Sequence, residues 1–307
     1  MKRISLFFTI LFLLGSLCLA KRNTRISDKE QDNLFGKVKA VQTMEYSVVS
    51  KNKEVQKGEM FARTVKTYNK AGYTTENTEF DTDNTILQKE VFIFDNKGNK
   101  IEELLYDDDG ELEQRITIKY NSLNLPVKFI YEDDNGKIIQ KFVHQYDERD
   151  YLVQLTGYDD KGRMSEKSYY TYNQQGNITQ YTGFGQFENQ KIYYKYDLSG
   201  KLTEQIFTDT KDNFIEKITF QYENQYKTEK RICLNENNQT LYSKTYIYDD
   251  YNNLLEFIHV DKDGQIVEKQ QFAYKYGKNN NWIQQISYTG VEKSPVSIIE
   301  RVIEYYE

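Results

Sequence analysis

The stretch YDDDGELEQRITIKY, from Tyr106 to Tyr120, joins an acidic run to a segment in which the side chains alternate strictly. Such alternation is typical of a β-strand whose two faces meet different surroundings. The run Asp107–Asp109 with Gly110 allows two interpretations. It is either a set of metal ligands or the corner of a hairpin, and the rest of the chain shows which is favoured.

A motif of Tyr or Phe, then Asn or Asp, two variable residues, and Gly or Asn recurs through the chain. Successive motifs are 26 residues apart, except for one step of 24 and one of 28. A weaker aromatic anchor, such as Phe80, Tyr106 or Tyr158, falls between them. The repeating unit therefore comprises two strands and two turns. The anchors of the main motif are Tyr68, Phe94, Tyr120, Tyr146, Tyr172, Tyr196, Tyr222, Tyr248 and Tyr276.

The corners carry the residue types that most easily adopt positive φ. Gly, Asn or Asp stands four residues after nearly every anchor, and an Asx residue usually follows the anchor directly. This pattern predicts a type I turn followed by a left-handed residue, closed by the Asx side chain. The glycines expected at such corners are Gly72, Gly98, Gly110, Gly162, Gly176, Gly200 and Gly264.

Alternate positions before each anchor separate into an aromatic face and a largely polar face. β-Branched and aromatic residues dominate, which suits strands and disfavours helices. We therefore predict an all-β fold: a long antiparallel meander of tandem 26-residue two-strand repeats, twisted and curled. About twenty strands at ~4.8 Å spacing would give a ribbon about 95 Å long. The sequence leaves open whether this sheet closes on itself.

The chain divides into five expected parts. Residues 2–20 combine Lys2 and Arg3 with an apolar run ending at Ala20, which is typical of a secretory signal peptide. Cys18 raises the alternative of a lipoprotein anchor, although Leu17 stands where lipid-modified precursors carry a small residue. No later segment is apolar enough to span a membrane, so we expect an exported protein of the periplasm, cell surface or medium. The parts are a signal peptide (1–20), a flexible leader (21–36), an N-terminal capping hairpin (37–68), the repeat array (69–280) and C-terminal capping strands (281–307).

Charge narrows the range of partners. The formal net charge is −6, and removal of Lys2 and Arg3 with the signal peptide makes it −8. Nucleic acids and anionic membranes bind preferentially to basic surfaces, so neither is an expected partner of this acidic chain. Cys233 is the one cysteine left after residue 20, so no disulfide within the chain is expected.

The segments YDDDGELEQ, YDDKGRMSE, YDLSGKLTE, FDNKGNKIEE and VDKDGQIVEK resemble the YD-repeat, or Rhs-like, family. The resemblance covers roughly residues 68–290, and exported repeat proteins of Bacteroidetes look particularly similar. It implies a curling antiparallel sheet, hollow in the large toxin members, and a location at the surface or envelope. This chain has no toxin domain and no segment like the one that precedes self-cleavage in those toxins. The family's cargo-cage function therefore does not carry over.

The equivalent corners decide between the two interpretations of the acidic run. In YEDDNG, YDDKG, VDKDG and YDLSG the acidic residues interchange with Lys, Ser and Asn, while the Asx and Gly positions persist. This behaviour favours a hairpin corner over a calcium site. His144 and His259 have no second ligand at zinc spacing. We expect no metal, no cofactor and no enzymatic activity, and we nominate no catalytic residue.

One aromatic column is the candidate binding surface. It comprises Tyr170, Tyr194, Phe220, Tyr246 and Tyr274, each two residues before an anchor. These rings would either hold the sheet together as a cross-strand ladder or present flat surfaces to a ligand. The resulting hypothesis is an exported, non-enzymatic β-repeat scaffold that binds a protein or another envelope component. The alternative is a carbohydrate-binding protein that uses exposed tyrosines.

Overall fold

The computed structural model describes residues 26–51, 54–185, 189–224 and 227–307. The expected signal peptide, Cys18 and residues 21–25 of the expected leader lie outside the described residues. The helical elements are α2 (Asp28–Gln31) and the 3₁₀ turn η3 (Lys278–Asn280). The strands are β1 (Val38–Lys51), β2 (Glu54–Tyr68), β3 (Thr74–Phe80), β4 (Ile86–Phe94), β5 (Lys100–Tyr106), β6 (Leu112–Tyr120), β7 (Pro126–Asp133), β8 (Ile138–Tyr146), β9 (Leu152–Asp159), β10 (Met164–Tyr172), β11 (Ile178–Gly185), β12 (Gln190–Tyr196), β13 (Leu202–Asp209), β14 (Phe214–Glu223), β15 (Thr228–Leu234), β16 (Thr240–Tyr248), β17 (Leu254–Asp261), β18 (Ile266–Tyr276), β19 (Trp282–Thr289) and β20 (Ser294–Tyr305).

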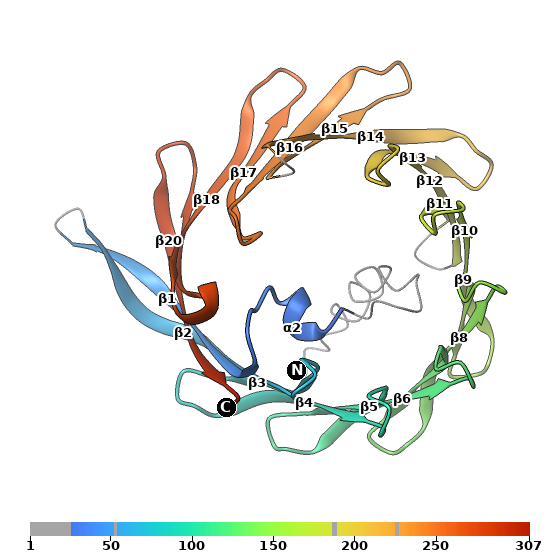
Figure 1. The fold of residues 1–307 in the computed structure, drawn as a ribbon, viewed down its shortest axis with the longest axis horizontal. Helices are drawn as coiled ribbons and strands as arrows, with labels where there is room; N and C mark the ends of the chain where they lie inside the picture. The colour runs from blue at the N-terminus through green and yellow to red at the C-terminus, as the bar shows by residue number, and fades with distance from the viewer. Residues whose placement is uncertain (1–25, 52–53, 186–188, 225–226) are drawn as a thin grey trace.

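The strands form one closed antiparallel sheet. Each strand pairs with the next one along the chain, and β1 also pairs with β20 from Val38–Tyr305 to Tyr46–Ile298. The predicted all-β antiparallel meander is confirmed, and the question of closure is settled in favour of a barrel (Figure 1). The terminal segments 37–68 and 281–307 were expected to shield free sheet edges. They pair with each other instead, so closure satisfies both edges with backbone hydrogen bonds.

The described corners that carry the Asx and Gly pattern are closed as this pattern predicts. In the turn after β4, Asp95 N donates to Asn99 O (2.9 Å) and Gly98 N donates to Asp95 O (3.0 Å). The Asp95 Oδ1 atom also accepts from the backbone N of Lys97 (2.9 Å) and of Asn99 (2.8 Å). A residue with positive φ ends the turn, since only this conformation returns the chain into the ladder. The φ values of Gly72, Gly98, Gly110, Gly162, Gly176, Gly200 and Gly264 lie between 75° and 87°.

Several tyrosines at or near the anchor positions join neighbouring repeats through their hydroxyl groups. The Tyr146 hydroxyl donates to Pro126 O (2.7 Å). Pro126 is the first residue of β7 and directly follows the preceding corner at the same end of the barrel. The same bond, made over 18 or 20 residues, links Tyr120 to Lys100, Tyr172 to Leu152, Tyr196 to Ile178 and Tyr274 to Leu254, at 2.7–2.9 Å. We call these bonds the tyrosine clamps. Phe94 lacks the hydroxyl and cannot make one.

The clamp identifies an irregularity near the closing strands. Tyr274, rather than the expected anchor Tyr276, donates to the carbonyl 20 residues earlier. Tyr276 still precedes a corner, which includes η3 and in which Gly277 N donates to Asn281 O (2.8 Å). β18 therefore continues two residues beyond Tyr274, and its pairing with β19 extends further towards this C-terminal end than its pairing with β17 does. This explains the 28-residue step in the sequence.

Residues 26–36 lie inside the ring of strands and are well bound, contrary to the flexible leader expected over 21–36 (Figure 1). Ser27 and Glu30 form a capping box that starts α2. Asp32 accepts from Lys66 Nζ (2.9 Å) and from the Tyr68 hydroxyl (2.6 Å). Phe35 N donates to Asn281 Oδ1 (2.8 Å). Local composition suggested flexibility, but these long-range partners hold the segment in place.

These contacts identify the face of the sheet that points inward. Because Asp32 lies within the ring, Lys66 and Tyr68 of β2 face the lumen. Directly opposed residues share a face, so the pairing register extends this assignment from strand to strand. A closed perimeter of about 95 Å gives a backbone circle about 30 Å across, about three times the spacing of packed sheets. Side chains on opposite walls therefore cannot meet as in a sandwich, and the buried apolar residues form small clusters along the wall.

Candidate binding surface in the lumen

The register places the predicted aromatic column on the luminal face. Lys66 opposes Asn77 in β3, and the equivalent pairs further along are Tyr170–Tyr181, Tyr194–Gln205, Phe220–Arg231, Tyr246–Phe257 and Tyr274–Gln285. Tyr170 is buried at 8 % exposure, whereas the other members of the column are half-buried. Tyr170 therefore belongs to the wall, and the other rings leave part of their surface to the lumen.

The column is not a continuous ladder. Its members lie two strands apart, about 9.6 Å, so each ring contacts a residue of the intervening odd-numbered strand. Ring centroids are 5.4 Å apart for Tyr170–Tyr181 and 5.2 Å apart for Tyr246–Phe257. The Arg231 guanidinium carbon lies 4.7 Å from the Tyr246 ring centroid. These odd-strand partners were missed in the sequence because only the positions before the main anchors were compared.

One aromatic cluster rigidifies the wall between β7 and β11. Phe142, Leu155 and Tyr170 are buried together. The half-buried residues Phe129, Tyr131, Leu152, Tyr172, Ile178 and Tyr181 pack against them. Burial within this wall lowers the pKa of His144 to about 4, so its imidazole is neutral at neutral pH. Apolar packing at this arc holds the rings in fixed positions relative to one another.

A row of glutamine and glutamate side chains lies on the same face of the sheet as the rings. The register places Leu105 and Tyr131 on the luminal face, and they oppose Gln114 and Gln140. Gln114 and Gln140 stand six residues before the anchors Tyr120 and Tyr146, so this position of the repeat faces the lumen. The row comprises Gln88, Gln114, Gln140, Glu166, Gln190 and Glu216. Glutamine amides both donate and accept hydrogen bonds, whereas the carboxylates of Glu166 and Glu216 accept them, so the luminal face combines flat rings with hydrogen-bonding groups.

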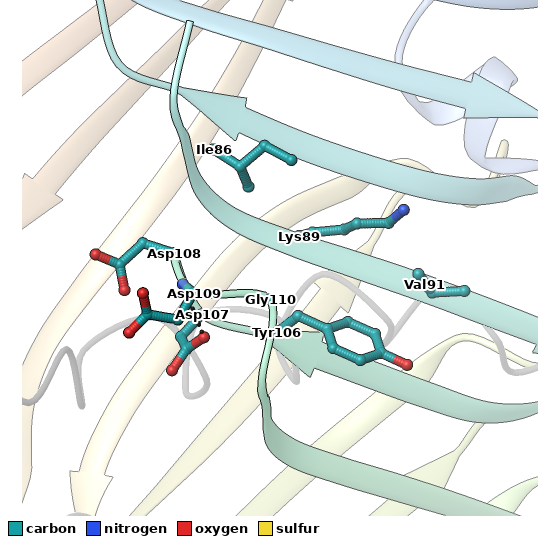
Figure 2. A pocket seen from close by; sticks show the side chains of 8 residues that line it. All are labelled: Ile86, Lys89, Val91, Tyr106, Asp107, Asp108, Asp109 and Gly110. Atoms are coloured by element: carbon teal, nitrogen blue, oxygen red, sulfur yellow. Dashed lines mark hydrogen bonds between the residues drawn. The ribbon is translucent and has the colours of Figure 1, made fainter.

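The acidic run that opens the repeat forms a corner. Asp107 Oδ1 accepts from the backbone N of Asp109 (3.1 Å) and of Glu111 (2.9 Å). Figure 2 shows the carboxylates of Asp107, Asp108 and Asp109 pointing in different directions rather than converging. They border a shallow hollow with Ile86 and Lys89. The structure thus has the predicted hairpin corner at this position.

Two further properties concern the described residues as a whole. No group of three or more His, Cys, Asp and Glu side chains within them is arranged to hold a metal ion. Over the same part of the chain, no helix is both long enough and apolar enough to cross a bilayer. Cys233, fully buried, has a thiol pKa that burial raises to about 11, and its Sγ lies 3.2 Å from Glu216 Oε2.

Comparison with known proteins gives distant likenesses of fold. No family model and no curated protein matches the chain. A porin-like protein from Bacteroides uniformis is 10 % identical over 87 % of this chain and 96 % of its own, with a TM-score of 0.37. A porin-like protein from Bacteroides vulgatus is 11 % identical over 88 % and 98 %, with a TM-score of 0.22. The TcdB2-TccC3-Cdc42 structure is 12 % identical over 86 % of this chain but 17 % of its own, with a TM-score of 0.34. Similarity of this extent establishes neither family membership nor function.

Proposed function

We propose that the protein is an exported, non-enzymatic binding protein of the bacterial cell envelope. Its partner would be a protein or another envelope component held against the luminal aromatic wall. The observation that carries this proposal is the half-buried state of Tyr194, Phe220, Tyr246 and Tyr274 on the inner face of a closed barrel. Rings fixed by cross-strand partners lose little conformational entropy on binding, which favours association. The expected signal peptide supports export.

The rigidity of the wall supports binding through a preformed surface. The regular repeats present closely similar geometry because similar corners and an equivalent register set their strands. Extended repeat surfaces commonly engage elongated partners, since equivalent contacts recur at a fixed spacing. Here the spacing is about 9.6 Å, the width of two strands.

A neutral glycan is the second candidate ligand. It is favoured by the luminal glutamines Gln88, Gln114, Gln140 and Gln190, since sugars present apolar faces to aromatic rings and hydroxyl groups to amides. Gln140 and Tyr131, which oppose each other on the luminal face, exemplify this combination. Protein and glycan ligands are distinguished by the following experiment.

The mature chain, residues 21–307, would serve as bait in envelope extracts and as a probe on glycan arrays. Tyr246→Ala removes a luminal ring, and Tyr169→Ala is the matched control because Tyr169 lies on the outer face at 38 % exposure. We expect a ligand that Tyr169→Ala retains and Tyr246→Ala loses, while both variants remain folded at the assay temperature in thermal unfolding. Equal binding by both variants, or no ligand in either assay, would contradict the proposal.

A further inference from the structure

A small polar pocket lies in the lumen beneath the N-terminal segment, next to the seam where the barrel closes. Its volume is about 190 Å³. Arg301 of β20, Thr43 of β1 and Thr64 of β2 line it, and they oppose one another in register. Side chains opposed in this way lie about 5 Å apart, so the guanidinium and the two hydroxyl groups form one row across three strands. Lys66 and Asp32 complete the polar lining.

The charges in this pocket do not balance. Asp32 is already engaged, since it accepts from Lys66 Nζ (2.9 Å) and the Tyr68 hydroxyl (2.6 Å). The two acids of α2, Asp28 and Glu30, accept from Thr74 N (2.7 Å) and Ser27 N (2.9 Å), and neither lines the pocket. No described carboxylate lies within ion-pair distance of Arg301. Among the residues that line the pocket, Arg301 and Lys66 are cationic and Asp32 is anionic, so the lining carries one excess positive charge.

Arg301 itself is held in place but incompletely satisfied. Its guanidinium carbon lies 3.5 Å from the centre of the Trp282 ring, which fixes the plane of the group. Its Nε atom is buried and has no hydrogen-bond partner. Burial lowers the pKa of Arg301 to about 10, which still leaves the group cationic at neutral pH. A buried donor without a partner is costly, so an anion that fills the pocket would relieve this cost.

We propose that this pocket binds the carboxylate group of a small organic anion. The planar guanidinium of Arg301 offers parallel donors that match the two oxygens of a carboxylate. The Thr43 and Thr64 hydroxyl groups lie in the same row, and Lys66 supplies further positive charge. A single excess positive charge matches a monoanion, and the nearby Asp32 would oppose the second charge of a phosphate. Leu34 and Val41 give the pocket an apolar edge against which a short carbon chain can lie.

The protein contains a built-in reporter of this site. Trp282 is the one tryptophan in the sequence, and it stacks directly on Arg301. Its fluorescence should therefore respond when an anion draws the guanidinium toward the pocket. The mature chain would be titrated at constant ionic strength with acetate and lactate, with inorganic phosphate, and with glucose as a neutral compound. Thermal shift measurements on the same samples would provide a second readout.

We expect a saturable fluorescence change with lactate and acetate, weaker binding of phosphate and no response to glucose. Arg301→Lys should weaken lactate binding at least tenfold because the fork is lost while the charge remains. Arg63→Gln is the matched control, since Arg63 also stacks on a ring, that of Phe80 at 4.4 Å, but on the outer face. Thr64→Val provides a mild second variant, should Arg301→Lys fold poorly, with several-fold weaker binding expected.

Two results would overturn the proposal: a wild-type chain that shows no saturable response, or equal lactate affinity in wild type, Arg301→Lys and Thr64→Val. Phosphate binding as tight as lactate binding would refute the assignment to a carboxylate. Tyr246 is a member of the aromatic column that does not line this pocket. Lactate affinity should therefore be the same in Tyr246→Ala, which tests the wall alone.

Discussion

Removal of the tyrosine clamps tests why the repeat favours tyrosine over phenylalanine at its anchors. The proposed variant combines Tyr120→Phe, Tyr146→Phe and Tyr172→Phe. Each substitution keeps the ring and deletes a hydroxyl that donates to a carbonyl at 2.7–2.8 Å. All three rings are at least half-buried, so water replaces the lost donor only in part.

The expected magnitude follows from the number of clamps removed. One hydrogen bond of this kind contributes about 1 kcal/mol net. Neighbouring clamps lie two strands apart, roughly 10 Å, where contributions are close to additive. The triple variant should therefore lose about 3 kcal/mol of unfolding free energy. With a urea slope of about 3 kcal/mol per molar, the midpoint should fall by about 1 M.

The assay is urea unfolding followed by circular dichroism. Tyr169→Phe on the outer face is the control and should change stability by less than about 0.5 kcal/mol. The reciprocal variant Phe94→Tyr adds the missing hydroxyl opposite the Thr74 carbonyl, 20 residues earlier, and should stabilise the protein by about 0.5 kcal/mol. A triple variant within about 0.5 kcal/mol of wild type would refute the clamp, and the anchor rings alone would then account for the motif.

Three further predictions concern single side chains. The pKa of His144 is about 4 in the folded protein and near 6.5 when unfolded, so the unfolded state binds more protons between these values. The free energy of unfolding should therefore fall by up to about 3 kcal/mol as the pH drops from 6.5 towards 4. In urea unfolding at several pH values, His144→Phe should flatten this part of the stability profile. Parallel profiles of the variant and the wild type would contradict the prediction. The buried Cys233 thiol, with its pKa raised to about 11, should resist Ellman's reagent in the native protein and react once unfolded, so rapid native labelling would speak against the burial. Asp32→Asn weakens the bonds to Lys66 and Tyr68 and should cost about 1 kcal/mol in urea unfolding while increasing proteolysis before Val38, whereas unchanged cleavage would show that other contacts hold the segment.

The repeat and its corners could be predicted from sequence because they depend on local chemistry. The Asx and Gly residues at a corner such as Asp95–Gly98 bond to their own backbone, and a 26-residue period makes the pattern visible. Closure could not be predicted, since it depends on pairing between Val38 and Tyr305 at opposite ends of the chain. Nothing in either segment differs from an ordinary strand. The choice between an edge that is capped and an edge that pairs is made by the geometry of the whole sheet.

The candidate sites show the same division. The aromatic column was found because its members recur at one position of the repeat, but its luminal partners on the odd strands were not. Arg301, Thr43 and Trp282 lie in the terminal segments, where no period exists to reveal an unusual residue. A signal was nevertheless present, since Trp282 is unique in a chain with 27 tyrosines. A residue type that occurs once in a repeat protein indicates a position where the structure departs from the regular repeat.

That place is the closing seam, and its position has a physical reason. Every regular repeat is bordered by two copies of itself, so its side chains are already matched to their neighbours. β20, β1 and β2 are bordered by unlike strands, and residues 26–36 cover them from within. There a cation such as Arg301 is buried with no repeated acid beside it in the pocket lining. A closed array of near-identical units therefore concentrates its chemical asymmetry, and with it the capacity for a specific small-molecule site, where its two ends meet.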